Sequence, residues 1–173
     1  VAVGVTLLPL LTRQLQSGEA KAALGSQNRA IEFALTLTLP AAAALIIIPG
    51  PIVTVLFQRG AFGSASAEAT ASTLAAFAFG LPAYVLLKAL TPGFFARGDT
   101  KTPVKVAIVA MIANVVLALA LMQMLAHVGI ALATALSAWF NATTLAILMV
   151  RREHLIFDAR LRRRVPRLIL ASA

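Results

Sequence analysis

Few residues of this sequence can do polar chemistry, and two of them stand where apolar stretches end. Arg13 follows an apolar run, and Lys88 follows an uncharged stretch from residue 69 to residue 87. A guanidinium is a planar fork of donors suited to the oxygens of a phosphate group, and partial desolvation strengthens such pairing. Alternatively, both side chains snorkel to the interface and fix membrane topology, which is the favoured interpretation for Lys88. Both are therefore candidate anion-binding residues.

A second group of charges lies between residues 90 and 107. It contains Arg97, Asp99, Lys101 and Lys105. Asp99 can pair with Arg97 or Lys101, or it can anchor the segment to a neighbouring helix end. We interpret these charges as a structural or gating loop and not as substrate ligands.

Two neutral polar residues lie deep in uncharged stretches, Asn114 and Thr134. Their oxygens are weak candidate ligands for a small cation, although the residue one turn after Asn114 is Ala118 and no carboxylate is near. The competing interpretation is an interhelical hydrogen bond. Asn114 and Thr134 reach one depth only if the first helix ends near Leu121 and residues 122–127 form a loop. Asn141 and Trp139 are interpreted as packing residues.

The sequence contains no recognisable enzyme signature. It has no HExxH motif, no phosphate-cradling glycine loop and no pair of carboxylates inside an apolar stretch, and its only histidines are His127 and His154. It also has no cysteine and therefore no thiolate metal site. We expect a protein that is not an enzyme and that uses no metal or cofactor.

The elements that carry these residues are predicted to be membrane-spanning helices. Hydrophobic residues make up 60% of the chain and charged residues 12%, whereas an ordinary soluble domain has about 45–50% and about 25%. A bilayer core needs roughly 20 apolar helical residues per crossing. The uncharged stretches therefore predict an all-α, polytopic membrane protein with four spans, at residues 29–48, 68–90, 104–124 and 129–150.

The apolar runs at the two ends predict two further helices, each cut by the limits of the chain. The first covers residues 1–12, and the second begins within residues 165–173. With no charged leader before the first run, we expect residues 1–173 to be one membrane-embedded segment of a longer polypeptide.

Prolines and glycines set the predicted helix boundaries. Pro49-Gly50-Pro51 ends the first span near Ile48, so residues 52–57 are expected to form a short turn, and the next helix to start after residues 63–67. Pro82 should kink that helix. Thr102 and Pro103 are expected to be the N-cap and first residue of the third span. The turn before the fourth span is expected at residues 127–129.

Basic residues are distributed asymmetrically between the predicted loops. Fourteen of the fifteen lie in residues 13–32, 88–105 and 151–167, and Arg59 lies on the opposite side. The positive-inside rule places the three basic segments in the cytoplasm. The net charge of +9 therefore indicates anionic lipids as partners, notably for residues 160–164, and not nucleic acid.

Three motifs in order resemble one protein family. Residues 90–107, LTPGFFARGDTKTPVKVA, resemble the cytoplasmic loop of the MurJ/MviN family of lipid II flippases, with Phe95 in place of the commoner tyrosine. Residues 8–13 (LPLLTR) resemble the end of a family helix, and residues 56–62 (LFQRGAF) resemble an outer loop of the family. In the family, the arginine that corresponds to the end of LPLLTR lines the transport cavity. The resemblance therefore implies the same role for Arg13.

The resemblance implies a fragment of a fourteen-helix, two-lobe transporter of the multidrug/oligosaccharidyl-lipid/polysaccharide exporter superfamily. The fragment would belong to the C-terminal lobe and would pair with an N-terminal lobe outside this chain. The implied function is transport of the undecaprenyl-pyrophosphate-linked peptidoglycan precursor, lipid II, from the inner to the outer leaflet of the bacterial cytoplasmic membrane by alternating access. The alternatives are an ion-coupled exporter of other lipid-linked glycans or drugs, and a non-transporting membrane scaffold.

Overall fold

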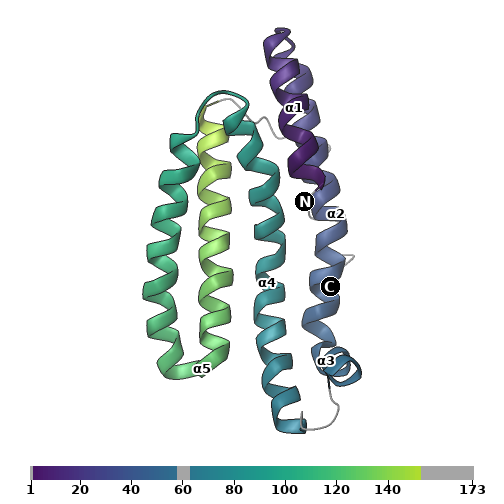
Figure 1. Cartoon of the computed structure of the whole chain (residues 1–173), viewed down its shortest axis with the longest axis vertical. Helices are drawn as coiled ribbons and strands as arrows, with labels where there is room; N and C mark the ends of the chain where they lie inside the picture. Colours follow the sequence, from purple (N-terminus) through teal and green to yellow (C-terminus); the bar gives the residue numbers. More distant parts are fainter. Residues whose placement is uncertain (1, 58–62, 153–173) are drawn as a thin grey trace.

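The structure, a computed structural model, describes residues 2–57 and 63–152 and contains five helices (Figure 1). They are α1 (Ala2–Gln16), α2 (Ala20–Ile47), α3 (Pro49–Phe57), α4 (Ser64–Phe95) and α5 (Lys101–Arg151). The described residues contain no strand, which confirms the predicted all-α class. Arg59 and the predicted helix within residues 165–173 lie outside the described residues, as do the basic residues 160–164.

Helices α1 and α2 form a hairpin around a glycine turn. Gly18 has a φ of +77°, the left-handed conformation that glycine adopts at helix ends. The Gly18 N–H donates to the Leu15 carbonyl at 3.2 Å, and the Glu19 N–H donates to the Gln14 carbonyl at 2.9 Å. Leu7, Leu11 and Ala23 form the apolar contact between the two helices. As a result α1 continues to Gln16, beyond the predicted residue 12, and α2 starts nine residues before the predicted span.

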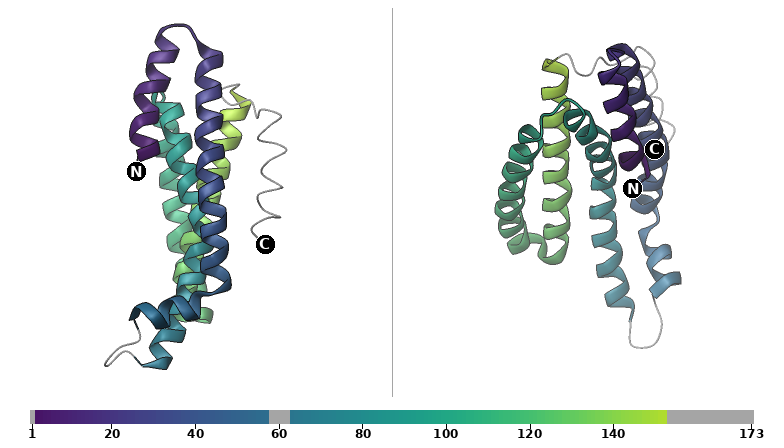
Figure 2. Two further views of the ribbon diagram at one scale, coloured as in Figure 1. Left: turned by 90° about the vertical axis from the view of Figure 1, so that its right-hand side faces the viewer. Right: turned by 45° about the horizontal axis from the view of Figure 1, so that its top comes forward.

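The Pro49-Gly50-Pro51 sequence ends α2 but does not end helical structure. A new helix, α3, begins at Pro49 and continues to Phe57, so the expected turn at residues 52–57 is wrong. Proline is favoured in the first turn of a helix because the N–H that it lacks has no intrahelical partner there. Figure 2 shows α3 turning away from the axis of α2. Val53 of α3 packs against Ala67 and Ala71 of α4.

Helix α4 runs for 32 residues and is continuous through Pro82 and Pro92. It starts at Ser64, earlier than expected, and extends five residues beyond Leu90. Its middle lies very close to α5: a Cβ added at Gly80 would lie 3.0 Å from both Cα and Cβ of Ala135. The Trp139 indole N–H also donates to the Phe79 carbonyl at 3.0 Å. The Ala- and Gly-rich face therefore permits the close helix packing that membrane proteins use.

Helix α5 consists of two arms joined at Ala126, the first covering residues 101–125 and the second residues 127–151. Ala126 has non-helical backbone angles (φ 48°, ψ −127°), and the chain reverses there (Figure 1). The first arm starts at Lys101, earlier than the expected Thr102-Pro103 start, and continues to residue 125, one residue beyond the predicted end of the span. The condition for Asn114 and Thr134 to lie at one depth, an end near Leu121, is therefore not met. A Cβ at Gly129 would lie 2.3 Å from the Leu121 carbonyl oxygen. Glycine therefore lets the second arm begin directly against the end of the first.

Among the residues that the structure describes, three helices are long and apolar enough to cross a membrane: α2, α4 and α5. Because α5 has 51 residues, a straight helix of that length would measure about 75 Å, more than twice the roughly 30 Å bilayer core. Its two arms together with α2 and α4 supply four apolar segments. The α1–α2 turn, the α4–α5 connection and the end of the second arm all lie at the top of Figure 1. This end carries basic residues of all three segments within the described part of the chain, and we call it the basic end.

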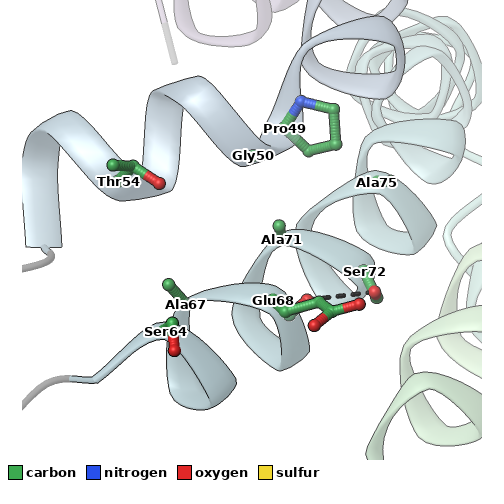
Figure 3. Close-up of a pocket in the computed structure, with 9 residues that line it drawn as sticks. All are labelled: Pro49, Gly50, Thr54, Ser64, Ala67, Glu68, Ala71, Ser72 and Ala75. Carbon is green, nitrogen blue, oxygen red and sulfur yellow. Dashed lines mark hydrogen bonds between the residues drawn. The ribbon is translucent and has the colours of Figure 1, made fainter.

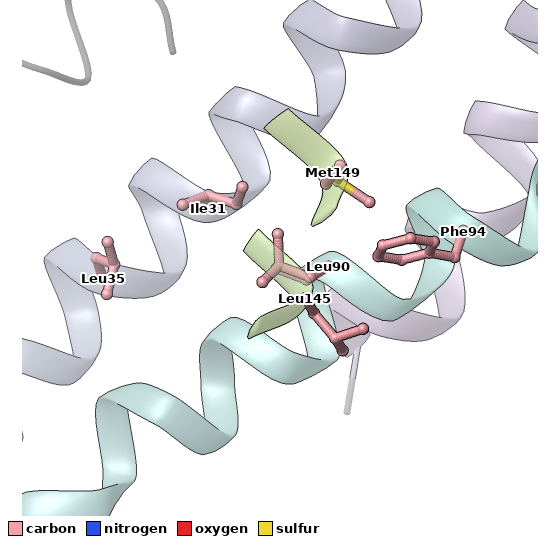
Figure 4. Close-up of a cluster of buried hydrophobic side chains, with 7 residues drawn as sticks. Ile31, Leu35, Leu90, Phe94, Leu145 and Met149 are labelled. Atoms are coloured by element: carbon pink, nitrogen blue, oxygen red, sulfur yellow. The ribbon is translucent and has the colours of Figure 1, made fainter. Parts of the chain in front are cut away.

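The largest apolar core lies near the basic end. Ile31 and Leu35 of α2, Leu90 and Phe94 of α4, and Leu145 and Met149 of α5 converge there (Figure 4). Phe94 and Met149 are fully buried. The core therefore fixes the end of α4, from which the segment with the conspicuous charges emerges.

Candidate functional site

The segment of residues 90–107, which we call the signature segment, contains the last turn of α4, a short connection and the start of α5. Gly98 has a φ of +75°. The Gly98 N–H donates to the Phe95 carbonyl at 2.9 Å, and the Asp99 N–H donates to the Phe94 carbonyl at 3.1 Å. This pair of bonds is the Schellman arrangement, which needs a left-handed residue at the position of Gly98. The local sequence therefore turns the chain sharply from α4 towards α5.

Asp99 ties the two ends of α5 together. Its Oδ1 accepts a 3.0 Å hydrogen bond from the Thr102 N–H at the start of the first arm. Its Oδ2 forms an ion pair with Nη1 of Arg152, which directly follows the second arm. Nη2 of Arg152 donates to the Thr102 hydroxyl at 3.3 Å. Of the three partners considered for Asp99, the structure therefore selects the neighbouring helix end over Arg97 and Lys101.

These contacts also set the charge state of Asp99. Hydrogen bonds from the Thr102 side chain and backbone N–H, together with the Arg152 guanidinium, lower the pKa of Asp99 from 3.8 to about 2. The carboxylate is therefore ionised throughout the physiological range. Arg152 was not predicted as a site residue. The only signal for it was the Arg151-Arg152 pair at the end of an apolar stretch, and that pair does not name a partner.

The other cations of the signature segment have different surroundings. Arg97 is half-buried, and its Nη1 donates to the Gly93 carbonyl at 2.7 Å. Burial lowers the pKa of the Arg97 guanidinium below its ordinary value. Lys101 and Lys105 are exposed on the first turns of α5. Arg97 therefore has a structural contact, whereas the two lysines present their charges outwards.

Arg13 and Lys88 are both exposed. Arg13 lies in the last turn of α1, next to a Thr12 hydroxyl that donates to the Leu8 carbonyl at 2.9 Å. Lys88 precedes two fully or almost fully buried residues of α4, Ala89 and Leu90. Within residues 2–57 and 63–152, neither side chain forms a hydrogen bond or ion pair. The structure thus leaves both cations available to a ligand or to the membrane interface.

Asn114 and Thr134 line one pocket of about 200 Å³ between α4 and the two arms of α5. They share it although the first arm continues past Leu121, because the pocket extends along the helices. Tyr84, Ser137 and Asn141 also line it. Ser137 donates to the Thr134 carbonyl at 3.0 Å, and Tyr84 donates to the same oxygen at 3.4 Å. The pocket is therefore a small neutral polar site with no carboxylate in its wall.

Asn141, expected only to pack, contributes an unusual group to this pocket. Its Oδ1 is buried and accepts no hydrogen bond within the described part of the chain. The Thr134 hydroxyl, by contrast, donates to the Ile130 carbonyl at 2.8 Å. The spacing of seven residues places Thr134 and Asn141 on one face of the helix. A sequence pattern could not reveal that the Asn141 oxygen is buried without a partner, because burial depends on how the helices pack.

A second pocket, of about 440 Å³, lies between α3 and the start of α4, at the end opposite the signature segment (Figure 3). Its lining includes Thr54, Ser64, Glu68 and Ser72. The Ser72 hydroxyl donates to the Glu68 backbone carbonyl at 3.0 Å, and the Glu68 side chain is exposed. Glu68 was not predicted as a site residue, because it stands at the edge of an uncharged stretch.

Comparisons with known proteins agree along the whole chain. The sequence profile of the family described as "Lipid II flippase MurJ" matches residues 1–172. A protein of Rhizobium tropici named "Probable lipid II flippase MurJ" is 49% identical over 100% of this chain. A protein of the same name from Rickettsia prowazekii is 40% identical over 88% of this chain. The chain spans 32% of the length of the first relative and 30% of the second.

A solved structure has the same fold. The chain is similar to "Lipid II flippase MurJ, inward closed conformation" with a TM-score of 0.81 and 24% sequence identity. The match covers 98% of this chain and 35% of the solved one. The helices of this chain therefore have the arrangement of part of a larger membrane transporter.

Proposed function

Because the chain belongs to the lipid II flippase MurJ family, we propose that it forms part of the C-terminal lobe of a transporter that carries lipid II from the inner to the outer leaflet. The observation that carries this proposal is the family match over residues 1–172, a range that covers all five described helices. The family acts in transport, and its members are multi-pass proteins of the bacterial cytoplasmic membrane. The substrate, the alternating-access mechanism and pairing with an N-terminal lobe belong to the proposal.

We assign the signature segment a gating role within this function. Asp99 is bound to Thr102 and Arg152, so the connection between α4 and α5 follows the position of both ends of α5. Alternating access requires helices of a lobe to move as packed bodies. An ion pair that joins the connection to both arms supports their movement together. Arg97, Lys101 and Lys105 add positive charge at the basic end, where anionic lipid headgroups are expected.

Arg13 is proposed to bind the pyrophosphate of the substrate. Its side chain is exposed on α1 and has no partner among the described residues, and an intramembrane or interfacial cation without a partner is a functional candidate. The guanidinium can donate two parallel hydrogen bonds to phosphate oxygens, whereas lysine offers a point charge. Lys88, also exposed, is a weaker candidate for the same role. Asn114 and Thr134 are proposed only as a weak cation site, because their pocket lacks a carboxylate.

Complementation of a flippase-depleted strain tests the function and the role of Arg13 together. The full-length protein that carries this segment should restore growth, Arg13→Lys should restore it partly, and Arg13→Ala should restore it least. Arg29→Ala is a matched control, because Arg29 is also an exposed arginine and lies on α2, the other helix of the hairpin. Each variant is compared at equal protein level in the membrane.

Two outcomes separate the alternatives. Failure of the unmutated protein to complement would refute lipid II transport in favour of export of another substrate or a scaffold role. Full complementation by Arg13→Ala at normal expression would return Arg13 to a snorkelling residue that sets topology, since the other basic residues still hold the orientation.

A further inference from the structure

Gln27 is a polar residue in the place of a core residue. Its side chain is 0% exposed, one helical turn before Ile31 of the core in Figure 4. Its Nε2 donates only to the Met149 sulfur, at 3.1 Å, and a thioether is a weak acceptor. Its Oε1 is buried and accepts no hydrogen bond from any described residue. Because a buried polar group without a partner is costly, the hydrogen bonding of Gln27 does not explain its presence.

The shape of the site does explain it. Gly93 lies in the last turn of α4 with no side chain of its own, and the Gln27 carboxamide occupies the space beside it. A Cβ at Gly93 would lie 2.2 Å from Nε2, 2.6 Å from Oε1 and 2.8 Å from Cδ of Gln27. All three contacts are shorter than any Cβ tolerates, so an alanine at position 93 requires the Gln27 carboxamide to move. The carboxamide is the end of a flexible side chain, but Gln27 is fully buried, so it can move only by displacing the groups packed around it.

The contact between Gln27 and Gly93 adjoins the hydrogen bonds that hold Arg97 and Asp99 in the signature segment. The Gly93 carbonyl accepts the hydrogen bond of Arg97, and the next carbonyl, of Phe94, accepts that of the Asp99 N–H. Met149, the other neighbour of Gln27, lies three residues before Arg152, the ion-pair partner of Asp99. Gln27 of α2 thus touches α4 just before the connection that carries Asp99, and it touches the second arm of α5 just before Arg152.

We propose that Gln27 is a positioning residue for the signature segment. Its side chain is unbranched up to a flat carboxamide, which fills the gap at Gly93 and contacts Met149. Gln27 thereby sets the position of the ends of α4 and α5 against α2. This positioning would serve the gating proposed above. The expected effect on transport therefore rests on that proposed function. The carboxamide acts through its shape, and methionine, which is unbranched and of similar length, should replace it.

The test uses the full-length protein, with a single reporter cysteine in place of Thr100 and any cysteine outside this segment removed. Thr100 is exposed in the connection between α4 and α5, and this chain has no cysteine of its own. Labelling of the reporter by a thiol reagent in inside-out vesicles measures how firmly the signature segment is held. Complementation of the depleted strain and protein level are measured in parallel.

Gly93→Ala should raise the labelling rate about tenfold or more and reduce complementation, because overpacking displaces the end of α4. Adding Gln27→Ala to Gly93→Ala should restore both readouts to within about twofold of the unmutated protein, since the smaller side chain frees the space. Gly80→Ala is the matched control. Its added Cβ meets Ala135 instead, so Gln27→Ala should not rescue it. By itself, Gln27→Ala should raise labelling and Gln27→Met should not.

Normal labelling and growth with Gly93→Ala would overturn the proposal, and so would a Gly93→Ala defect that Gln27→Ala leaves unchanged. If Gly93→Ala does not accumulate in the membrane, restoration of its level by Gln27→Ala is the supporting result. In that case equal labelling of Gln27→Ala and the unmutated protein refutes positioning. Labelling does not depend on the substrate. Failure of the unmutated protein to complement would therefore count against lipid II transport and leave the role of Gln27 to be judged by labelling alone.

Discussion

Replacing Gly80 by alanine tests how closely α4 approaches the second arm of α5. The new Cβ would lie 3.0 Å from the Cα and Cβ atoms of Ala135 and 3.2 Å from Cε2 of Tyr84. Carbon atoms in ordinary van der Waals contact are about 3.5–4.0 Å apart. Because the Cα atom of Ala135 belongs to the backbone, it cannot rotate away. The two helices must therefore separate by several tenths of an ångström.

Two opposing effects determine the result. Alanine gains about 0.8–1.0 kcal/mol over glycine through helix propensity, and overpacking at a tight helix crossing costs about 1–3 kcal/mol. Gly80→Ala should thus be destabilising by up to about 2 kcal/mol. Gly25→Ala is the matched control, because Gly25 lies inside α2 with nothing within 4 Å of its added Cβ. The propensity gain cancels between the two variants, so their difference isolates the overpacking cost of about 1–3 kcal/mol.

The assay is reversible unfolding of the full-length protein in mixed micelles, with the denaturing detergent titrated. Gly25→Ala should unfold at a higher detergent fraction than the unmutated protein, and Gly80→Ala at a lower one than Gly25→Ala. Equal stabilisation by Gly25→Ala and Gly80→Ala would refute the close approach.

Two further predictions concern the polar contacts. The pKa of Asp99 is depressed to about 2, so its contribution is fully present above the ordinary value of 3.8 and is lost as the pH falls from about 4 to about 2. Hydrogen exchange of the Thr102 amide, corrected for its intrinsic rate, should show constant protection from pH 8 to about pH 5 and loss of protection below about pH 4. The Asp99→Asn variant should lower the protection of this amide over the whole pH range. A decline that begins already near pH 6 would contradict this assignment. Asn141→Leu should be neutral or stabilising in detergent unfolding, because it removes a buried Oδ1 without a described partner, and a loss above about 1 kcal/mol would mean that Asn141 has a bound ligand or water.

The fold class and the family could be predicted from the amino-acid sequence alone. Uncharged stretches of roughly 20 residues predict spanning helices because the bilayer requires that length and that composition locally. The glycine and proline positions located the breaks, but not their form. Pro49 begins a helix in the structure, and the reversal occurs at Ala126, one residue before the predicted turn. Helix ends of this kind depend on what the chain packs against, which local preference does not contain.

The partners of the polar residues, in contrast, depend on how the helices pack. The sequence offered three possible partners for Asp99: Arg97, Lys101 or a neighbouring helix end. In the structure the partner is Arg152 at such a helix end, 53 residues away. Gln27 and Met149 are separated by 122 residues and meet only after α2, α4 and α5 have packed. Asn141 joins Asn114 and Thr134 because the two arms of α5 fold back on each other against α4. The length of an apolar stretch is a property of consecutive residues, so the sequence alone determines it. A polar contact depends on the packing and rotation of helices that are distant in sequence, and for that reason only the tertiary structure identified the site.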